Sequence, residues 1–154
     1  MKSLVFVAAI SLLLIAPTFQ ASAEDQPVAP AVAVAAVEAA PPIAIGDAAA
    51  GEKVFLQCRA CHQVGPTAKN AVGPVLNGII GRKAGTYVGY NYSEANKNSG
   101  IVWTQAKFEE YIQNPKGVVV GTKMSYPGLK KETDVGNILA YLLSFNAEGQ
   151  KATQ

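Results

Sequence analysis

Five consecutive residues, Cys58-Arg59-Ala60-Cys61-His62, contain both cysteines and the only histidine of this 154-residue chain. Cysteines three positions apart lie on one face of a helical turn, so both thiols can meet the same edge of one flat ligand. His62 follows directly and can point its imidazole at the centre of that ligand. We therefore expect the chain to fold around a group that this segment holds.

The spacing Cys-x-x-Cys-His is the signature of c-type haem attachment. Cys58 and Cys61 would add to the two haem vinyl groups, and His62 would become the proximal ligand of the iron. Three alternatives fit less well. A redox-active dithiol normally accompanies a βαβ pattern, which is absent here. A zinc site needs a fourth ligand from Cys or another His, and the chain has neither. The third alternative is a structural disulfide in an exported chain.

Met124 is the only methionine besides the initiator, and it follows His62 by 62 positions. A single methionine is usually core filler. This one stands in a predicted loop, far enough along the chain to reach the other face of a haem. Thioether sulfur favours ferrous iron and closes the sixth coordination position. His62 and Met124 as the metal ligands therefore predict a one-electron carrier and not an enzyme.

The first 23 residues have the pattern of an export signal. Lys2 is the only charged residue before Glu24, and an apolar run extends from Leu4 to Pro17. The run ends near Ala21-Ser22-Ala23, which has small residues at the two positions that a signal peptidase recognises. We predict a cleaved signal peptide, residues 1–23, and a periplasmic protein. The alternative is a retained anchor, which would tether the protein to the periplasmic face of the inner membrane.

The remaining chain divides by composition into a tether (24–45), a folded domain (46–146) and a short tail (147–154). The tether contains eight Ala and four Pro, a composition that favours an extended linker. Residues 46–154 contain 12 Lys and Arg against 8 Asp and Glu, a net charge of +4. No basic block is present, so a nucleic-acid partner is not expected.

Capping residues and apolar spacing predict three helices in the domain. The first begins after Asp47, the second after Thr104, and the third contains Val135. The first should end by Gly65 and the second at Asn114, which precedes a proline.

Long loops should connect these helices, because residues 73–89 and 117–129 are rich in glycine and lack strand alternation. Gly136 inside the last helix suggests close approach of another backbone, and Gly51 of the first helix is the natural partner. We therefore predict an all-α domain with a tight crossing of its N- and C-terminal helices.

Several further stretches form a recognisable set: Gly51-Glu52-Lys53-Val54-Phe55, Gly73-Pro74, Gly81-Arg82-Lys83, Tyr92-Ser93-Glu94-Ala95-Asn96-Lys97-Asn98, Gly100-Ile101-Val102-Trp103, Asn114-Pro115-Lys116, Gly121-Thr122-Lys123-Met124 and Ala140-Tyr141-Leu142. With them the domain resembles the class I c-type cytochromes, closely mitochondrial cytochrome c and the small bacterial electron-carrier cytochromes c. The resemblance implies a cytochrome c-like fold, in which long loops wrap around one covalently attached haem c.

The resemblance also implies roles for seven residues besides the cysteines and the axial ligands. The Pro74 carbonyl would accept a hydrogen bond from the His62 ring. The other six would surround the haem propionates (Arg82, Tyr92, Asn96, Trp103) or support Met124 (Tyr111, Thr122). The sequence departs from the family pattern at Tyr126, where phenylalanine is usual, and at Val120, where proline is usual.

Basic residues in loops and at helix ends resemble the family's docking surface for acidic faces of membrane complexes: Arg59, Lys69, Lys83, Lys116, Lys123, Lys130 and Lys131. A monomer is expected, with membrane contact only if the N-terminal segment is retained. A cytochrome bc complex would be the donor. A terminal oxidase, a photosynthetic reaction centre or a periplasmic reductase would be the acceptor.

Two functions from other classes stay open. One is a haem enzyme or gas sensor with a labile sixth ligand, and the other is a signalling protein in which haem only stabilises the fold.

Overall fold

The computed structural model of the chain describes residues 45–151. The predicted signal peptide, residues 24–44 of the predicted tether and residues 152–154 of the predicted tail lie outside the described residues. Between residues 45 and 151 the fold is helical, and strand pairing is limited to two isolated bridges. The helices are α1 (Ala48–Phe55), α2 (Glu94–Lys97), α3 (Gln105–Gln113), α4 (Pro115–Val118) and α5 (Glu132–Leu143). The all-α prediction is confirmed.

Helix α1 begins where the sequence predicts, because the Asp47 carboxylate accepts a hydrogen bond of 2.6 Å from the Ala50 N–H. The α-helix ends at Phe55, but tight turns continue the chain direction to residue 61. The N–H groups of Leu56, Gln57, Cys58 and Cys61 bond to the carbonyl three residues earlier, and that from Cys58 to Phe55 is 2.8 Å long. The Arg59 N–H keeps the helical spacing, with a bond of 3.1 Å to the Phe55 carbonyl. The cysteine motif thus leaves α1 as a rigid helical turn.

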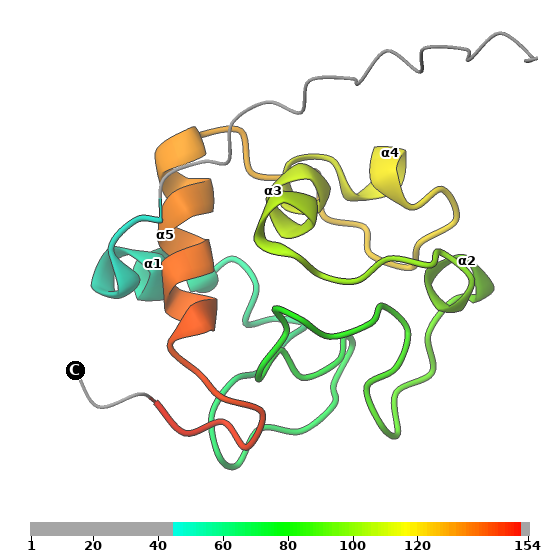
Figure 1. Ribbon diagram of the computed structural model, residues 1–154, viewed down its shortest axis with the longest axis horizontal. Helices are drawn as coiled ribbons and strands as arrows, with labels where there is room; N and C mark the ends of the chain where they lie inside the picture. Colours follow the sequence, from blue (N-terminus) through cyan, green and yellow to red (C-terminus); the bar gives the residue numbers. More distant parts are fainter. Residues whose placement is uncertain (1–44, 152–154) are drawn as a thin grey trace, which may run out of the picture. The chain divides into compact units, whose positions relative to one another are not determined.

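Helices α1 and α5 cross with their backbones in contact (Figure 1). A Cβ atom added to Gly51 would lie 2.0 Å from the Asn137 carbonyl oxygen and 2.7 Å from the Tyr141 Cβ. The Gly136 carbonyl accepts a hydrogen bond of 3.0 Å from the Gly46 N–H. The predicted tight crossing is present. Gly51 packs one residue beyond its predicted partner, and Gly46 takes the place beside Gly136.

Helix α3 begins after Thr104, whose hydroxyl accepts a hydrogen bond of 3.2 Å from the Lys107 N–H. Its apolar residues pack against α5 and form one core with residues from the loops. This core contains Phe55, Ile79, Ala84, Trp103, Phe108, Tyr111, Ile112, Val119, Leu129, Val135, Ile138, Leu139, Tyr141, Leu142 and Phe145.

Two short helices lie where the sequence predicted only irregular chain. Ser93 caps α2, with its hydroxyl 3.2 Å from the Asn96 N–H. Pro115 was expected to mark the end of helical structure after α3, but it opens α4, which Asn114 caps. Proline suits the first helical position because the N–H that it lacks would have no helical partner there. The prediction of three helices was incomplete for this reason.

Loops between α1 and α2 form the lower part of the described chain in Figure 1, drawn in green. The buried Asn77 side chain fastens them, because it accepts a hydrogen bond from the Gly65 N–H (2.8 Å) and donates one to the Gly65 carbonyl (2.9 Å). Residues 145–151 turn back toward this point, where Gly149 packs against Gly65.

No helix described between residues 45 and 151 is long and apolar enough to cross a membrane.

Replacing Gly51 by alanine tests the helix crossing. In an open helix this change stabilises by about 1 kcal/mol. Here the new methyl group would overlap Asn137, so we expect the free energy of unfolding to fall by about 1–3 kcal/mol. Denaturant unfolding of the haem-loaded protein measures it, with Lys53→Ala on the exposed side of α1 as control. A more stable Gly51→Ala variant would contradict the close contact.

Candidate cofactor site

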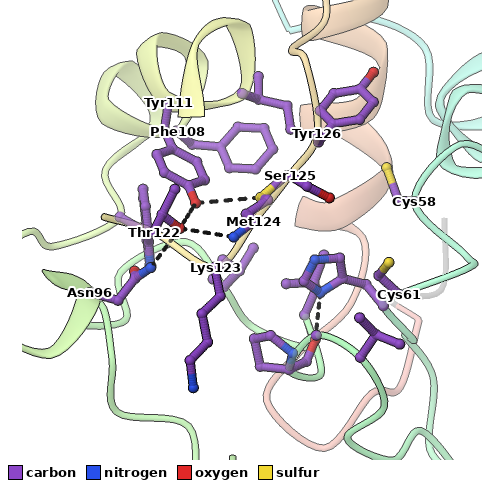
Figure 2. A pocket seen from close by; sticks show the side chains of 18 of the residues that line it. Cys58, Cys61, Asn96, Phe108, Tyr111, Thr122, Lys123, Met124, Ser125 and Tyr126 are labelled. Carbon is purple, nitrogen blue, oxygen red and sulfur yellow. Dashed lines mark hydrogen bonds between the residues drawn. The ribbon is translucent and has the colours of Figure 1, made fainter. Parts of the chain in front are cut away.

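The turn that follows α1 carries both cysteines and His62 to one wall of a cavity. The N–H groups of Cys61 and His62 both donate to the Cys58 carbonyl, at 3.0 and 2.8 Å. This local bonding keeps the two sulfurs on one side of the turn, as the three-residue spacing predicts (Figure 2). Both thiols are free and half-buried. Burial, followed by the proximity of Cys61, raises the pKa of the Cys58 thiol to about 11, so the group is neutral at pH 7.

The orientation of His62 is set by a backbone acceptor and by a glycine. Its Nδ1 lies 2.8 Å from the Pro74 carbonyl oxygen, which can only accept, so Nδ1 carries the proton. A Cβ atom on Gly73 would lie 2.3 Å from the His62 ring, so only glycine leaves room for the imidazole. Burial lowers the pKa of His62, although the bond to Pro74 opposes this effect. The ring is therefore neutral, with the Nε2 lone pair available to a metal.

A second wall of the cavity carries Met124 in a network of polar side chains (Figure 2). The Tyr111 hydroxyl donates to the Met124 sulfur at 3.4 Å and lies 3.3 Å from the Thr122 hydroxyl. The Thr122 hydroxyl oxygen accepts two further hydrogen bonds, from the Asn96 side-chain amide at 3.1 Å and from the Met124 N–H at 3.2 Å. Burial raises the pKa of Tyr111, so its hydroxyl stays protonated and remains a donor. Met124 is thus positioned by residues from α2 and α3.

The cavity between these walls has a volume of about 400 Å³, within the range of roughly 300–1,000 Å³ usual for cofactor sites. Ten of the eleven predicted site residues line it: Cys58, Cys61, His62, Pro74, Tyr92, Asn96, Trp103, Tyr111, Thr122 and Met124. The remaining wall is largely apolar and is shared with the core: Phe55, Ile79, Phe108, Ile112, Ile138 and Leu142.

This donor set fits a covalently bound haem. Two thiols stand at one edge, a neutral imidazole nitrogen is free to bind iron, and a thioether lines the same cavity. Apolar walls suit the porphyrin, and buried hydroxyl and amide groups suit its polar edge. His62 and Met124 could therefore hold the iron, and Cys58 and Cys61 could hold the ring.

Arg82 is the one predicted site residue that does not line the cavity. Its guanidinium donates to the backbone carbonyls of Asn77 (3.1 Å) and Val75 (3.0 Å) and lies 4.7 Å from the centre of the Tyr87 ring. Burial lowers the pKa of Arg82, and the neighbouring Tyr92 and Tyr87 raise it. In this structure Arg82 supports the loop that follows Pro74.

Sequence reasoning left several residues of the cavity unassigned, among them Tyr90 and Gln57. Tyr90 lines the cavity, donates to the Val72 carbonyl at 2.6 Å and packs against Tyr92 with ring centres 4.7 Å apart. Gln57 lines it from the position before Cys58. Tyr87, Tyr90 and Tyr92 lie within six residues of one another, and this cluster of tyrosines was a sequence signal that could have identified Tyr90. No sequence signal identified Gln57, because its hydrogen-bond partner, Tyr126, lies 69 positions away in the sequence.

Comparisons with known proteins point to one protein family. The family model described as cytochrome c matches residues 48–146. The chain is 60% identical over 116 residues to cytochrome c-554 of Methylosinus trichosporium, covering 75% of this chain and 88% of that protein. It is 56% identical over 110 residues to cytochrome c2 of Blastochloris viridis, covering 71% and 87%. The solved structure of cytochrome cH from Methylobacterium extorquens has a TM-score of 0.60 and 48% identity, covering 64% of this chain and 98% of that one.

Proposed function

This chain belongs to the cytochrome c family, and we propose that His62 and Met124 are the axial ligands of its single haem. The protein is a monohaem c-type cytochrome, with haem c bound covalently through Cys58 and Cys61, and it acts as a one-electron carrier. The observation that supports the axial assignment is that both side chains line the cavity that also holds the two cysteines.

A haem held by these residues would supply one iron for reversible one-electron exchange. The role of the chain would be to hold both proposed ligands in place in either oxidation state. The Pro74 carbonyl accepts a hydrogen bond from the His62 Nδ1–H, and the Tyr111 hydroxyl donates one to the Met124 sulfur. Because Met124 would occupy the sixth position, oxygen and peroxide find no open site. These features favour a carrier over an enzyme or a gas sensor.

The proposed propionate contacts are Tyr92, Asn96 and Trp103, which all line the cavity. Arg82 would act through the loop carbonyls that it binds and through the electrostatic attraction of its charge for the propionates. Tyr111 and Thr122 would hold Met124.

We propose a cytochrome bc complex as electron donor and a terminal oxidase, photosynthetic reaction centre or periplasmic reductase as acceptor. All seven basic residues of the predicted docking surface are exposed: Arg59, Lys69, Lys83, Lys116, Lys123, Lys130 and Lys131. Lys123 also lines the cavity that would hold the haem. Exposed positive charge near a redox centre steers acidic partners into short-lived complexes, which suits a monomeric shuttle.

Replacing Met124 by alanine tests the axial assignment. We expect loss of the red-region charge-transfer band of thioether-bound ferric iron, a lower reduction potential and ready carbon monoxide binding by the ferrous protein. Absorption spectroscopy and redox titration measure these changes. Val120→Ala, an 82% exposed position in the same loop, is the control and should keep the band. An unchanged band in Met124→Ala would refute the axial assignment. Carbon monoxide binding or peroxidase activity in the unaltered protein would instead favour a haem enzyme or a gas sensor.

Replacing Lys131 by glutamate tests the docking surface. At low ionic strength we expect the rate of electron transfer from a cytochrome bc complex to fall by about threefold, because an attractive charge becomes repulsive. The difference should vanish in high salt. Stopped-flow kinetics measure the rates, with Lys53→Glu on α1 as the matched charge reversal. Rates independent of ionic strength would argue against electrostatic docking.

We propose that the protein is periplasmic, with residues 1–23 removed as a signal peptide and residues 24–45 as a linker. The mass of the intact protein tests this proposal and haem attachment together. We expect a chain that starts at Glu24 and carries one covalent haem. A mass that retains residues 1–23 would instead support a membrane-tethered carrier.

A further inference from the structure

We propose that the hydrogen bond between Tyr126 and Gln57 is a latch that keeps the methionine loop, residues 119–129, closed over the haem cavity. The proposal rests on the proposed role of Met124 as axial ligand. It gives a specific function to Tyr126, one of the two positions at which this sequence departs from its family.

The bond joins two distant segments at the edge of the cavity. The Tyr126 hydroxyl donates to the Gln57 side-chain oxygen at 3.0 Å, across 69 positions of sequence. Both side chains line the cavity. Gln57 immediately precedes Cys58, and Tyr126 follows Met124 by two residues, so the bond links the covalent attachment segment to the axial methionine segment. Figure 2 shows Tyr126 on the side of the cavity where Cys58 lies.

The Gln57 end of the bond is anchored. Its N–H donates to the Val54 carbonyl at 3.1 Å, and the next N–H, that of Cys58, donates to Phe55 at 2.8 Å. These residues continue from α1, which is packed tightly on α5. The backbone of Gln57 is therefore held in place, and its exposed side chain offers the acceptor.

The Tyr126 end lies in a segment with few other restraints. Residues 124–130 have no regular secondary structure. The loop is held before this segment by the Thr122 hydroxyl network and after it by the bond from the Leu129 N–H to the Ile112 carbonyl (2.9 Å). Among the hydrogen bonds of residues 45–151, the Tyr126 bond is the one that ties residues 125–128 to the attachment segment.

Val120 makes such a restraint useful. This residue is 82% exposed and stands where the family usually has proline, so the loop lacks the restriction on φ that proline imposes. A side-chain bond across the cavity edge offsets that freedom in the folded state. A phenylalanine at position 126 could pack there, but it would have no hydroxyl to donate. We infer that the latch lowers the fraction of molecules in which the loop opens and Met124 leaves the iron.

Imidazole binding to the ferric, haem-loaded protein measures this fraction, because imidazole takes the sixth position only when Met124 has left it. The apparent affinity therefore rises in proportion to the open population. The variants are Tyr126→Phe, Gln57→Leu and the double variant, with Tyr87→Phe as a matched loss of a tyrosine hydroxyl elsewhere. We expect each single variant to bind imidazole about threefold to tenfold more tightly, the range that corresponds to one hydrogen bond. The double variant should bind no more tightly than either single variant, and Tyr87→Phe should match the unaltered protein.

Three outcomes would overturn the latch: unchanged affinity in Tyr126→Phe, additive effects in the double variant, or an equal effect of Tyr87→Phe. The thioether charge-transfer band of the unaltered ferric protein separates this failure from failure of the proposed function. If the band is present and the variants behave alike, only the latch is wrong. If the band is absent, Met124 is not the ligand, and both proposals fail.

Discussion

The contact between α1 and α5 is the constraint on which the rest of the structure depends. Gly51 brings the two backbones so close that a single methyl group would overlap Asn137. This contact fixes the direction in which α1 ends, and the turn that follows inherits that direction. The position of the two cysteines and His62 therefore depends on the packing of Gly51 in the helix that precedes them.

The hydrophobic core and the cofactor site share many of the same side chains. Eight residues that line the cavity also belong to the hydrophobic core, including Phe55 from α1, Phe108 from α3 and Leu142 from α5. A group that fills this cavity buries apolar surface on both sides, so its binding and the folding of the chain stabilise each other. This coupling explains how a small domain with long loops holds a single conformation.

Much of the architecture follows from local signals. Asp47 and Thr104 cap helices as predicted, and the apolar spacing around Val135 predicts α5. The two short helices were missed because four residues are too few to show a period, and because Pro115 both ends one helix and begins the next. Arg82 was expected at the propionates from family resemblance, but its contacts with two loop carbonyls depend on how the chain folds back on itself.

The sequence by itself determined the chemistry of this protein. The spacing of Cys58, Cys61 and His62 leaves one reasonable cofactor, because covalent attachment depends on residue type and short-range order. The single available Met124 is the proposed second ligand of the iron. Only the tertiary structure decided which distant residues meet around the site. The Tyr126–Gln57 bond joins positions 69 residues apart, and no local pattern encodes such a contact, since it exists only once the methionine loop and the turn after α1 have been brought to the same cavity edge.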